Sequence, residues 1–403
     1  MSVPARNVYL DNNATTCVAP EVLEAMLPFF NDLYGNASSM HLFGGQVARH
    51  LDTARSQVAA LLNAQPEEIV FTSCGTESDN HAIRGVCEAQ PDKRHIITTK
   101  VEHPAVLNVC RYLAKKGYRV TELGVDKQGN LNLDELKSAI TPDTAIVTVM
   151  AANNETGTLF PIDEIAKICA EKGVTFHTDA VQAAGKIALD MQKMPVNLLS
   201  ISGHKLHAPK GIGILYVRRG TRISPFMLGG HQERNRRAGT ENAPYIVGLG
   251  KACEVAINAM FDENNRLRKQ RDRLEKGLFD AIPYTHINGN PQWRLPNTTN
   301  LGFEFIEGEA ILLHLSAAGI AASSGSACTS GSLEPSHVLM AMQVPFTYAH
   351  GSVRFSLSRY TTDAEIDHTL AALPPIVEKL RGMSPFYADK LREMKAGAAT
   401  AQQ

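Results

Sequence analysis

The stretch LLSISGHKLHAPKGIGILYV, residues 198–217, carries the pattern that decides the fold. Its two apolar runs, 198–202 and 212–217, have the length and continuous hydrophobicity of buried strands. The loop between them contains Lys205, and the glycines Gly211 and Gly213 suggest a turn that makes one strand antiparallel. The stretch therefore predicts a buried sheet with a lysine close behind the end of one strand.

Further apolar runs alternate with helical patterns upstream of this stretch. The predicted strands there are 69–72, 95–99, 118–122, 145–150 and 174–178. The predicted helices are 46–62, one that starts at Thr76, 104–116 and 161–172. Strands interleaved with helices predict an α/β fold with a mostly parallel sheet of seven strands and helices on both faces.

A predicted long helix over 255–279 separates the last third of the chain from the rest. Its middle, DENNRLRKQRDRLEK, is mostly charged, which is typical of an exposed helix that links domains. The last third has its own predicted strands, 297–304 and 352–357, and helices, 308–318 and 363–380. We therefore expect a large domain over 15–260, a smaller α+β domain from 1–14 and 261–385, and a mobile tail over 386–403.

The composition excludes several classes of protein. The 40 Lys and Arg residues nearly balance the 41 Asp and Glu residues, so the charge gives no footprint for nucleic acid or an anionic membrane. No apolar run approaches the roughly 18 residues of a membrane helix, and the N-terminus lacks the apolar segment of a secretory signal. Seven scattered cysteines favour reduced thiols, so we expect a cytoplasmic protein.

The segment FTSCGTESDN, residues 71–80, combines a strand end, a turn of small residues and a helix start. Free backbone N–H groups around Gly75 and Thr76 would favour an anion there, most naturally a phosphate. A helix cap formed by Thr76 or Ser73 is the simpler alternative. The segment lacks the glycine–lysine pattern of nucleotide-binding loops.

Two charged side chains follow other predicted strands. Asp179 could ligate a metal, act as a base, pair with a protonated ring nitrogen, or cap a helix. Lys205 follows a fully buried strand, where lysine is rare, so it is either a Schiff-base lysine or a lysine that reaches the surface. Ser202 and His204 offer donors for a phosphate, while zinc bound by His204 and His207 has no supporting cysteine pair.

Cys328 lies in a loop rich in Gly, Ser and Thr, which we place at about 321–334. A thiol in such a loop is a better nucleophile than a buried thiol, although the loop could also be a linker with an incidental cysteine.

The groups found so far match the needs of pyridoxal phosphate. They are a phosphate site, the carboxylate of Asp179, the amine of Lys205 and a strand-end imidazole at His103. That cofactor requires a lysine Schiff base and an acidic partner for its ring nitrogen.

With these residues in place, the chain resembles the cysteine desulfurases, class V members of the fold-type I pyridoxal phosphate enzymes. The resemblance spans roughly residues 8–385, and its details are most similar to the NifS branch. The motifs that carry it are YLDNNATT, FTSCGTESDN, VEHPAVL, NNETGTLFPI, HTDAVQ, SGHKLHAPKG, GGHQERNRRAGTEN, SSGSACTSGSLEPS and VRFSLSRYTT.

The resemblance implies a role for each matched residue. Lys205 would form the Schiff base with pyridoxal phosphate, Asp179 would pair with its ring nitrogen, and Gln182 would contact its ring hydroxyl. The residues implied in holding the phosphate end are Gly75, Thr76, Ser202, Gly203, His204 and, from the neighbouring subunit of a homodimer, Thr240.

Other residues would act on the substrate, L-cysteine. Asn154, which would also contact the cofactor, and Arg354 would bind the substrate carboxylate. His103 would stack on the cofactor and move protons, and Cys328 would accept the sulfur as a persulfide. The resemblance thus implies a sulfurtransferase that produces L-alanine and passes sulfur to an iron–sulfur assembly scaffold. The clusters assembled there would be of the nitrogenase type, which serve nitrogen fixation. Cys328 would then be a transient iron ligand, the only metal-binding residue implied.

Three alternative functions remain open on the residues alone. A class V aminotransferase or selenocysteine lyase needs the lysine and aspartate but no nucleophilic Cys328. A thiol hydrolase using Cys328 and His103 leaves Lys205 unexplained. A sulfur-carrier or scaffold protein would dock partners without using Lys205 at all.

Overall fold

The computed structural model describes residues 8–324 and 335–400, with side chains described as far as residue 392. These residues form two compact units. The larger unit comprises 15–154 and 158–263, and the smaller comprises the described parts of 1–14, 155–157 and 264–403. None of the described helices is long and apolar enough to cross a membrane.

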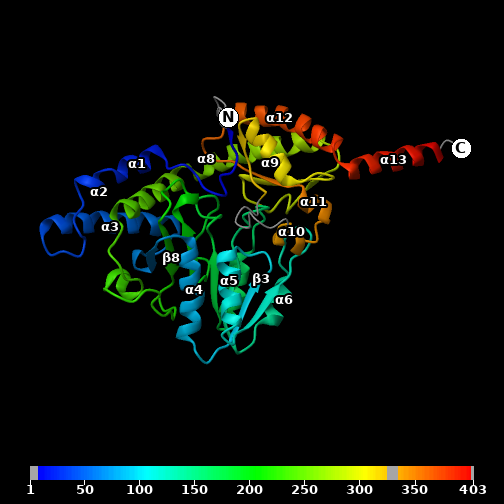
Figure 1. Cartoon of the computed structure of the whole chain (residues 1–403). Helices are drawn as coiled ribbons and strands as arrows, with labels where there is room; N and C mark the ends of the chain where they lie inside the picture. Colours follow the sequence, from blue (N-terminus) through cyan, green and yellow to red (C-terminus); the bar gives the residue numbers. More distant parts are fainter. Residues whose placement is uncertain (1–7, 325–334, 401–403) are drawn as a thin grey trace. The chain divides into compact units, whose positions relative to one another are not determined.

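The larger unit is built on a seven-stranded sheet (Figure 1). Its strand order is β2-β8-β7-β6-β5-β3-β4. The strands are β2 (Ile69–Thr72), β3 (His95–Thr99), β4 (Arg119–Leu123), β5 (Thr144–Thr148), β6 (Thr175–Asp179), β7 (Leu198–Ser202) and β8 (Gly213–Val217). Strand β8 is antiparallel to both of its neighbours, and the other pairings are parallel. The prediction of a mostly parallel α/β sheet with one antiparallel strand is confirmed.

Helices pack against this sheet, chiefly α4, together with α5 and α7. Figure 1 shows α4 and α5 beside the sheet. The helices of the larger unit are α1 (Pro20–Met26), α2 (Pro28–Asn31), α3 (Leu42–Leu61), α4 (Gly75–Ala89), α5 (Pro104–Ala114), α6 (Leu133–Ala139), α7 (Ile162–Glu171) and the first part of α8 (Ala243–Ala281). Every residue of β2, β3, β5, β7 and β8 is buried. This explains why these strands are continuous apolar runs and not alternating ones.

Two predicted helix boundaries are wrong. Helix α8 begins at Ala243, twelve residues before the predicted start at 255, and α3 begins at Leu42 instead of residue 46. The start of α8 contains Gly248 and Gly250, which weaken a helical pattern. A Cβ at Gly248 would lie 2.6 Å from Met26 Sδ, and one at Gly250 would lie 2.6 Å from Ala54 Cα. Glycine is therefore present in α8 because two other helices approach its backbone closely.

The smaller unit has a three-stranded antiparallel sheet of order β12-β10-β9 and a separate two-stranded pair, β1-β11. Its strands are β1 (Val8–Tyr9), β9 (Thr285–Ile287), β10 (Thr298–Phe303), β11 (Ile320–Ala321) and β12 (Ser352–Ser356). Its helices, besides the end of α8, are α9 (Gly308–Ala317), α10 (His337–Ala341), α11 (Phe346–His350), α12 (Asp363–Gly382) and α13 (Pro385–Thr400).

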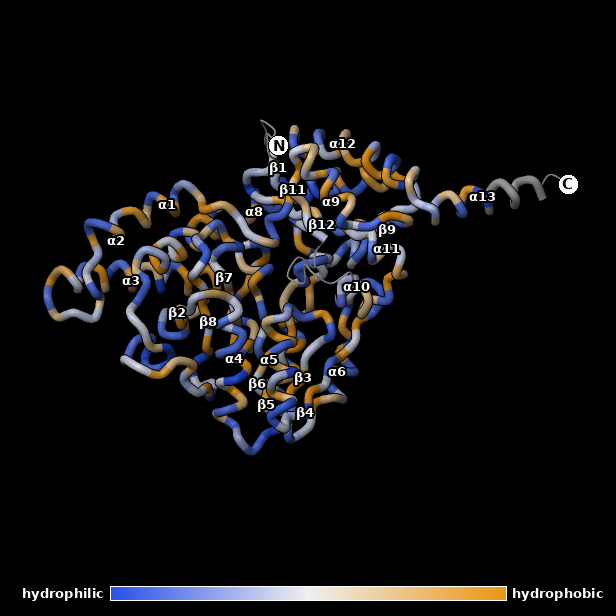
Figure 2. Tube along the Cα trace, viewed as in Figure 1, coloured by the Kyte–Doolittle hydropathy of each residue, from blue (hydrophilic) through white to orange (hydrophobic). Residues whose placement is uncertain are grey.

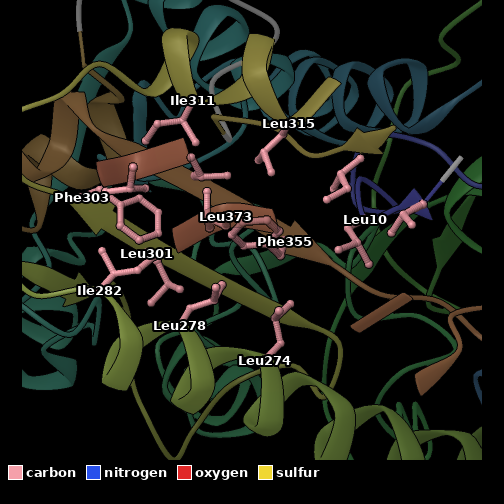
Figure 3. Packing of buried hydrophobic residues seen from close by; sticks show 14 of the residues in the cluster. Leu10, Leu274, Leu278, Ile282, Leu301, Phe303, Ile311, Leu315, Phe355 and Leu373 are labelled. Atoms are coloured by element: carbon pink, nitrogen blue, oxygen red, sulfur yellow. The ribbon is translucent and has the colours of Figure 1, made fainter. Parts of the chain in front are cut away.

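The core of the smaller unit joins both ends of the sequence (Figure 3). Leu10, from the N-terminal segment, belongs to the same buried cluster as Leu278 of α8 and Phe355 of β12. The tail over 386–403, expected to be mobile, contains most of helix α13, whose described part carries both hydrophilic and hydrophobic residues (Figure 2). The helix follows from the run of Ala, Lys, Leu, Arg and Glu, all good helix formers, after Pro385.

Candidate active site

The topology of the large sheet brings five strand ends to one edge. Strands β3, β5, β6 and β7 are parallel, so their carboxyl ends lie on the same side. Strand β2 joins them because it is antiparallel to β8, which is itself antiparallel to β7. Two reversals restore the direction. The segments that follow these strands carry His103, Asn154, Asp179, Lys205 and the start of α4, and ligands of open α/β sheets bind at such an edge.

The N-terminus of α4 forms a close-fitting cradle. The N-cap is Cys74, which makes no capping hydrogen bond, so the capping interpretation for Thr76 or Ser73 is wrong. The N–H of Ser73 instead donates to Glu77 Oε2 at 2.8 Å, and its hydroxyl donates to the same atom. A Cβ at Gly75 would lie 2.8 Å from Val181 Cγ2 and 3.3 Å from Ser202 Cβ. The helix start therefore lies directly against the segments that follow β6 and β7.

Asp179 is the last residue of β6 and is 7% exposed. Its Oδ1 accepts the N–H of Val181 at 2.9 Å, so the carboxylate orders the turn that packs on Gly75. Burial raises the pKa of Asp179 above its usual value, although the fields of His103 and Lys205 oppose this shift. These fields indicate that the carboxylate, the imidazole and the amine lie near one another. This hydrogen bond to the following turn resembles helix capping, which was one of the roles expected for Asp179.

Lys205 ends a single 3₁₀ turn, Gly203–Lys205, that follows β7 without a break. The turn is fixed from the N-terminal side of the unit, because the N–H and hydroxyl of Thr16 both donate to His204 O at 3.0 Å. The ring Nδ1 of His204 lies 3.2 Å from Thr15 Oγ1. Burial lowers the pKa of His204 to about 4, and Lys205 and Lys210 add to the shift, so its ring is neutral near pH 7.

His103 caps helix α5. Its Nδ1 accepts the N–H of Ala105 at 3.2 Å, so the neutral ring carries its proton on Nε2. His103 and Thr76 line the same open pocket of about 510 Å³, between α4 and α5. The structure thus brings the predicted imidazole to the side of the edge where α4 begins.

Three further predicted residues lie in the larger unit. Asn154 follows β5, half-buried, and Gln182 is buried three residues after Asp179. The backbone oxygen of Gln182 accepts from Lys186 Nζ at 3.0 Å, and burial together with the field of Lys205 lowers the pKa of Lys186 to about 7. Thr240 is exposed and lines a second pocket, of about 200 Å³, together with Ser73.

Arg354 lies in β12 of the smaller unit and is 2% exposed. Its guanidinium donates to Asp11 Oδ1 at 2.7 Å. Its backbone exchanges hydrogen bonds with Ser323, at 2.6 and 3.2 Å. On the other side, the hydroxyl of Ser336 donates to Glu155 Oε2 at 2.5 Å. Cys328 lies outside the described residues, between these two anchored positions.

Sequence reasoning missed two buried acidic residues near Asp179, which are Asp79 and Glu102. Asp79 of α4 is 1% exposed, and its Oδ1 lies 3.6 Å from Nε2 of the fully buried His177. Glu102 is also fully buried, and its Oε1 accepts the Thr99 hydroxyl at 2.7 Å and the Met150 N–H at 3.0 Å. The available signal was an aspartate on the apolar stripe of α4, in register with Ala82, Ile83 and Val86.

The described residues contain no group of three or more His, Cys, Asp and Glu side chains suited to a metal ion. His204 and His207 turn to different partners, since His207 Nδ1 lies 3.0 Å from Cys17 O. The donor set at the edge is instead an amine, a carboxylate, hydroxyls and backbone N–H groups. These groups fit an aromatic cofactor with a phosphate group, a basic ring nitrogen and an aldehyde, as pyridoxal phosphate has.

Comparisons with known proteins agree with this geometry. The sequence pattern of the family described as "Aminotransferase class-V" matches residues 8–369. A "Cysteine desulfurase" of Trichormus azollae is 61% identical over 98% of both chains. The "Cysteine desulfurase NifS" of Azotobacter vinelandii is 58% identical over 95% of this chain and 95% of its own. A solved structure described as "NIFS-LIKE PROTEIN" has a TM-score of 0.88 and 40% identity, and it covers 93% of this chain and 100% of its own.

Proposed function

Because the chain belongs to the cysteine desulfurases of the class-V aminotransferase family, we propose that it removes sulfur from L-cysteine, releases L-alanine and supplies iron–sulfur cluster assembly. It is a pyridoxal phosphate enzyme and a transferase. The observation that carries the proposal is the single sheet edge that gathers a lysine, a buried carboxylate and an uncapped helix start.

The phosphate group of the cofactor would bind at the start of α4. The backbone N–H groups of Gly75 and Thr76 point out of an uncapped helix end, which favours an anion. Ser202 lies against Gly75, and the neutral ring of His204 is held by the Thr15–Thr16 segment. Gly203 admits this turn because a Cβ there would lie 2.8 Å from Ile212 Cγ2.

The ring of the cofactor would lie over Asp179. Pyridoxal phosphate, when bound, supplies an electron sink that stabilises negative charge on the substrate Cα. Asp179 would accept the ring N–H, and Gln182 would contact the ring hydroxyl. Lys205 would move the Cα proton with its amine. His103, which carries its proton on Nε2, can donate that proton from a ring fixed by Ala105.

Arg354 and Asn154 would bind the substrate carboxylate. A guanidinium that is nearly inaccessible and already bonded to Asp11 on one side is held in one orientation. A fixed planar donor recognises a carboxylate through two parallel hydrogen bonds. Asp11 is therefore the residue that orients the substrate-binding side chain.

Cys328 would take the sulfur. Its thiolate would form an S–S bond with the substrate sulfur while the substrate C–S bond breaks, and that electron pair stays with the substrate carbon until it is protonated to alanine. Cys328 is the fifth residue after Ser323, so the two lie at most about 18 Å apart. Ser323 is joined to Arg354 by two backbone hydrogen bonds. The segment that contains Cys328 therefore begins next to the side chain proposed to bind the substrate carboxylate.

The finer assignments follow the same family. We propose a cytoplasmic homodimer in which Thr240 reaches the phosphate in the neighbouring subunit. The persulfide on Cys328 would pass to a scaffold protein, for nitrogenase-type clusters, and Cys328 would ligate iron transiently during transfer. The name NifS of one relative supports the nitrogen-fixation role.

The test is an assay of the purified protein with L-cysteine and dithiothreitol. We expect equimolar alanine and sulfide and a yellow chromophore. Lys205→Ala should lose the chromophore and the activity, whereas exposed Lys210→Ala should keep both. Cys328→Ala should keep the chromophore and lose sulfide release, whereas exposed Cys17→Ala should keep both. Full sulfide release by Cys328→Ala would contradict the proposal.

A further inference from the structure

A buried polar chain runs beneath the carboxylate of Asp179, on the face of the sheet covered by α4. His177 and Asp179 lie two residues apart on β6, so their side chains share that face. Ser200 of β7 is the register partner of Asp179. Asp79 lies on the buried side of α4, and this helix packs against β6 and β7 on the same face.

Two measured contacts and one close approach connect these side chains. Ser200 Oγ lies 3.0 Å from His177 Nε2, and His177 Nδ1 lies 2.8 Å from Thr148 Oγ1. The Ser200 side chain lies close enough to Asp79 to act on its pKa, and Asp79 Oδ1 has no hydrogen-bond partner in the described part of the chain. All four side chains are at most 1% exposed.

The charged groups near Asp79 disfavour the negatively charged form of its carboxyl group. The groups that act on Asp79 are the acids Asp179 and Glu102 and the thiol of Cys74, the N-cap residue of the same helix. The imidazole of His177 lies 3.6 Å away. Burial lowers the pKa of His177 to about 3, so this ring is neutral. Burial and the neighbouring acids raise the pKa of Asp79 well above its usual range, and burial raises the pKa of Glu102 to about 8.

We propose that Asp79 is a positioning residue that holds a proton and donates it to Ser200, which keeps the negative charge of this cluster on Asp179. The relay then runs from the Asp79 O–H to Ser200, from the Ser200 O–H to His177 Nε2, and from the His177 Nδ1–H to Thr148. Every donor in it has an acceptor. The inference rests on the proposed contact between Asp179 and the cofactor ring nitrogen.

The consequence concerns the cofactor. Two carboxylates that share a buried site cannot both ionise readily, and one of them gains a strongly raised pKa. A charged Asp79 would therefore push Asp179 toward its neutral form, and Asp179 would no longer keep the ring nitrogen protonated. A neutral Asp79 supports the strand end without competing for that charge.

The experiment is infrared spectroscopy of the holoenzyme at neutral pH, with aspartate labelled with ¹³C in its carboxyl group. We expect a label-sensitive band of a protonated carboxylic acid that disappears in Asp79→Asn. The matched control is Asp163→Asn, which removes an aspartate paired with Lys167 at 2.6 Å and should leave the band. Absence of the band from the labelled wild-type enzyme overturns the proposal, and this result does not depend on whether a variant folds.

The visible spectrum gives a second readout. An amide mimics a neutral acid, so Asp79→Asn should leave the pH midpoint of the cofactor band unchanged near neutral pH. A shift of about one pH unit or more would show that Asp79 is charged and would overturn the proposal. Asp179→Asn separates the two claims, since an unchanged visible spectrum in that variant would refute the cofactor contact while leaving the infrared result on Asp79 intact.

Discussion

Gly75→Ala tests the cradle with a single methyl group. The new Cβ would lie 2.8 Å from Val181 Cγ2 and 3.3 Å from Ser202 Cβ. Carbon atoms in ordinary contact lie at about 3.5–4.0 Å, so the valine methyl and the helix start must separate by at least about 0.7 Å. Val181 is β-branched and has few rotamers, and its N–H is bonded to Asp179, so it cannot turn aside cheaply.

The cost of such overpacking is typically about 1–3 kcal/mol. If the helix start moves away to relieve it, the phosphate loses N–H donors that were already in place. We therefore expect the cofactor to dissociate about 5- to 150-fold more readily, which is the same free energy expressed as a ratio of Kd values. The measurement is an absorbance titration of the apoenzyme with pyridoxal phosphate.

The matched control is Gly45→Ala in α3, where a Cβ has no neighbour within 4 Å. That variant should gain up to about 1 kcal/mol of stability, because alanine is the better helix former, and bind the cofactor as the wild type does. A Gly75→Ala enzyme with wild-type cofactor affinity would show that the start of α4 is not the phosphate site.

Two further perturbations concern the smaller unit. Asp11→Asn should raise KM for L-cysteine about tenfold with little change in kcat, because Arg354 loses the charged partner at 2.7 Å that orients it, and an unchanged KM would contradict this. Glu275→Gln should cost about 3–5 kcal/mol of unfolding free energy near pH 7, since it leaves the buried Arg294 without its bidentate carboxylate partner. Burial raises the pKa of Glu275, but the hydrogen bonds and charge of Arg294 outweigh it, so the folded pKa lies below the usual value. The difference from wild type in denaturant unfolding should therefore be full above about pH 4.3 and shrink as the pH falls through the lower folded pKa; a difference that grows in acid would refute this.

The large sheet could be predicted because its strands are buried on both faces. Strands β2, β3 and β7 have the predicted bounds, and β6 is displaced by only one residue, to end at Asp179. A continuous apolar run between polar turns is a local signal, and it requires no knowledge of the neighbouring strand. The positions of Asp179 and Lys205 at strand ends could be predicted for the same reason.

The start of α8 and the buried acids could not be predicted, because their causes are not local. Gly248 and Gly250 resemble breaks in a helix until α1 and α3 are known to pack against them. Asp79 lies on the apolar stripe of α4, but that stripe does not show what surrounds it, because its environment comes from Ser200 and His177, more than 90 residues away in the sequence. Burial of a charge depends on the tertiary arrangement, which no periodicity contains.

The position of Cys328 in the chain has a physical rationale in the residues that flank its segment. Ser323 is held by the backbone of Arg354, and Ser336 is held by the buried carboxylate of Glu155, next to Asn154. The two ends of the segment are thus fixed beside the two residues proposed to bind the substrate carboxylate. Fixed ends limit the conformational entropy that is lost when the chain between them is closed into a loop. A sulfur acceptor that must serve both a bound substrate and an outside partner needs freedom to move, within the reach that these two anchors set.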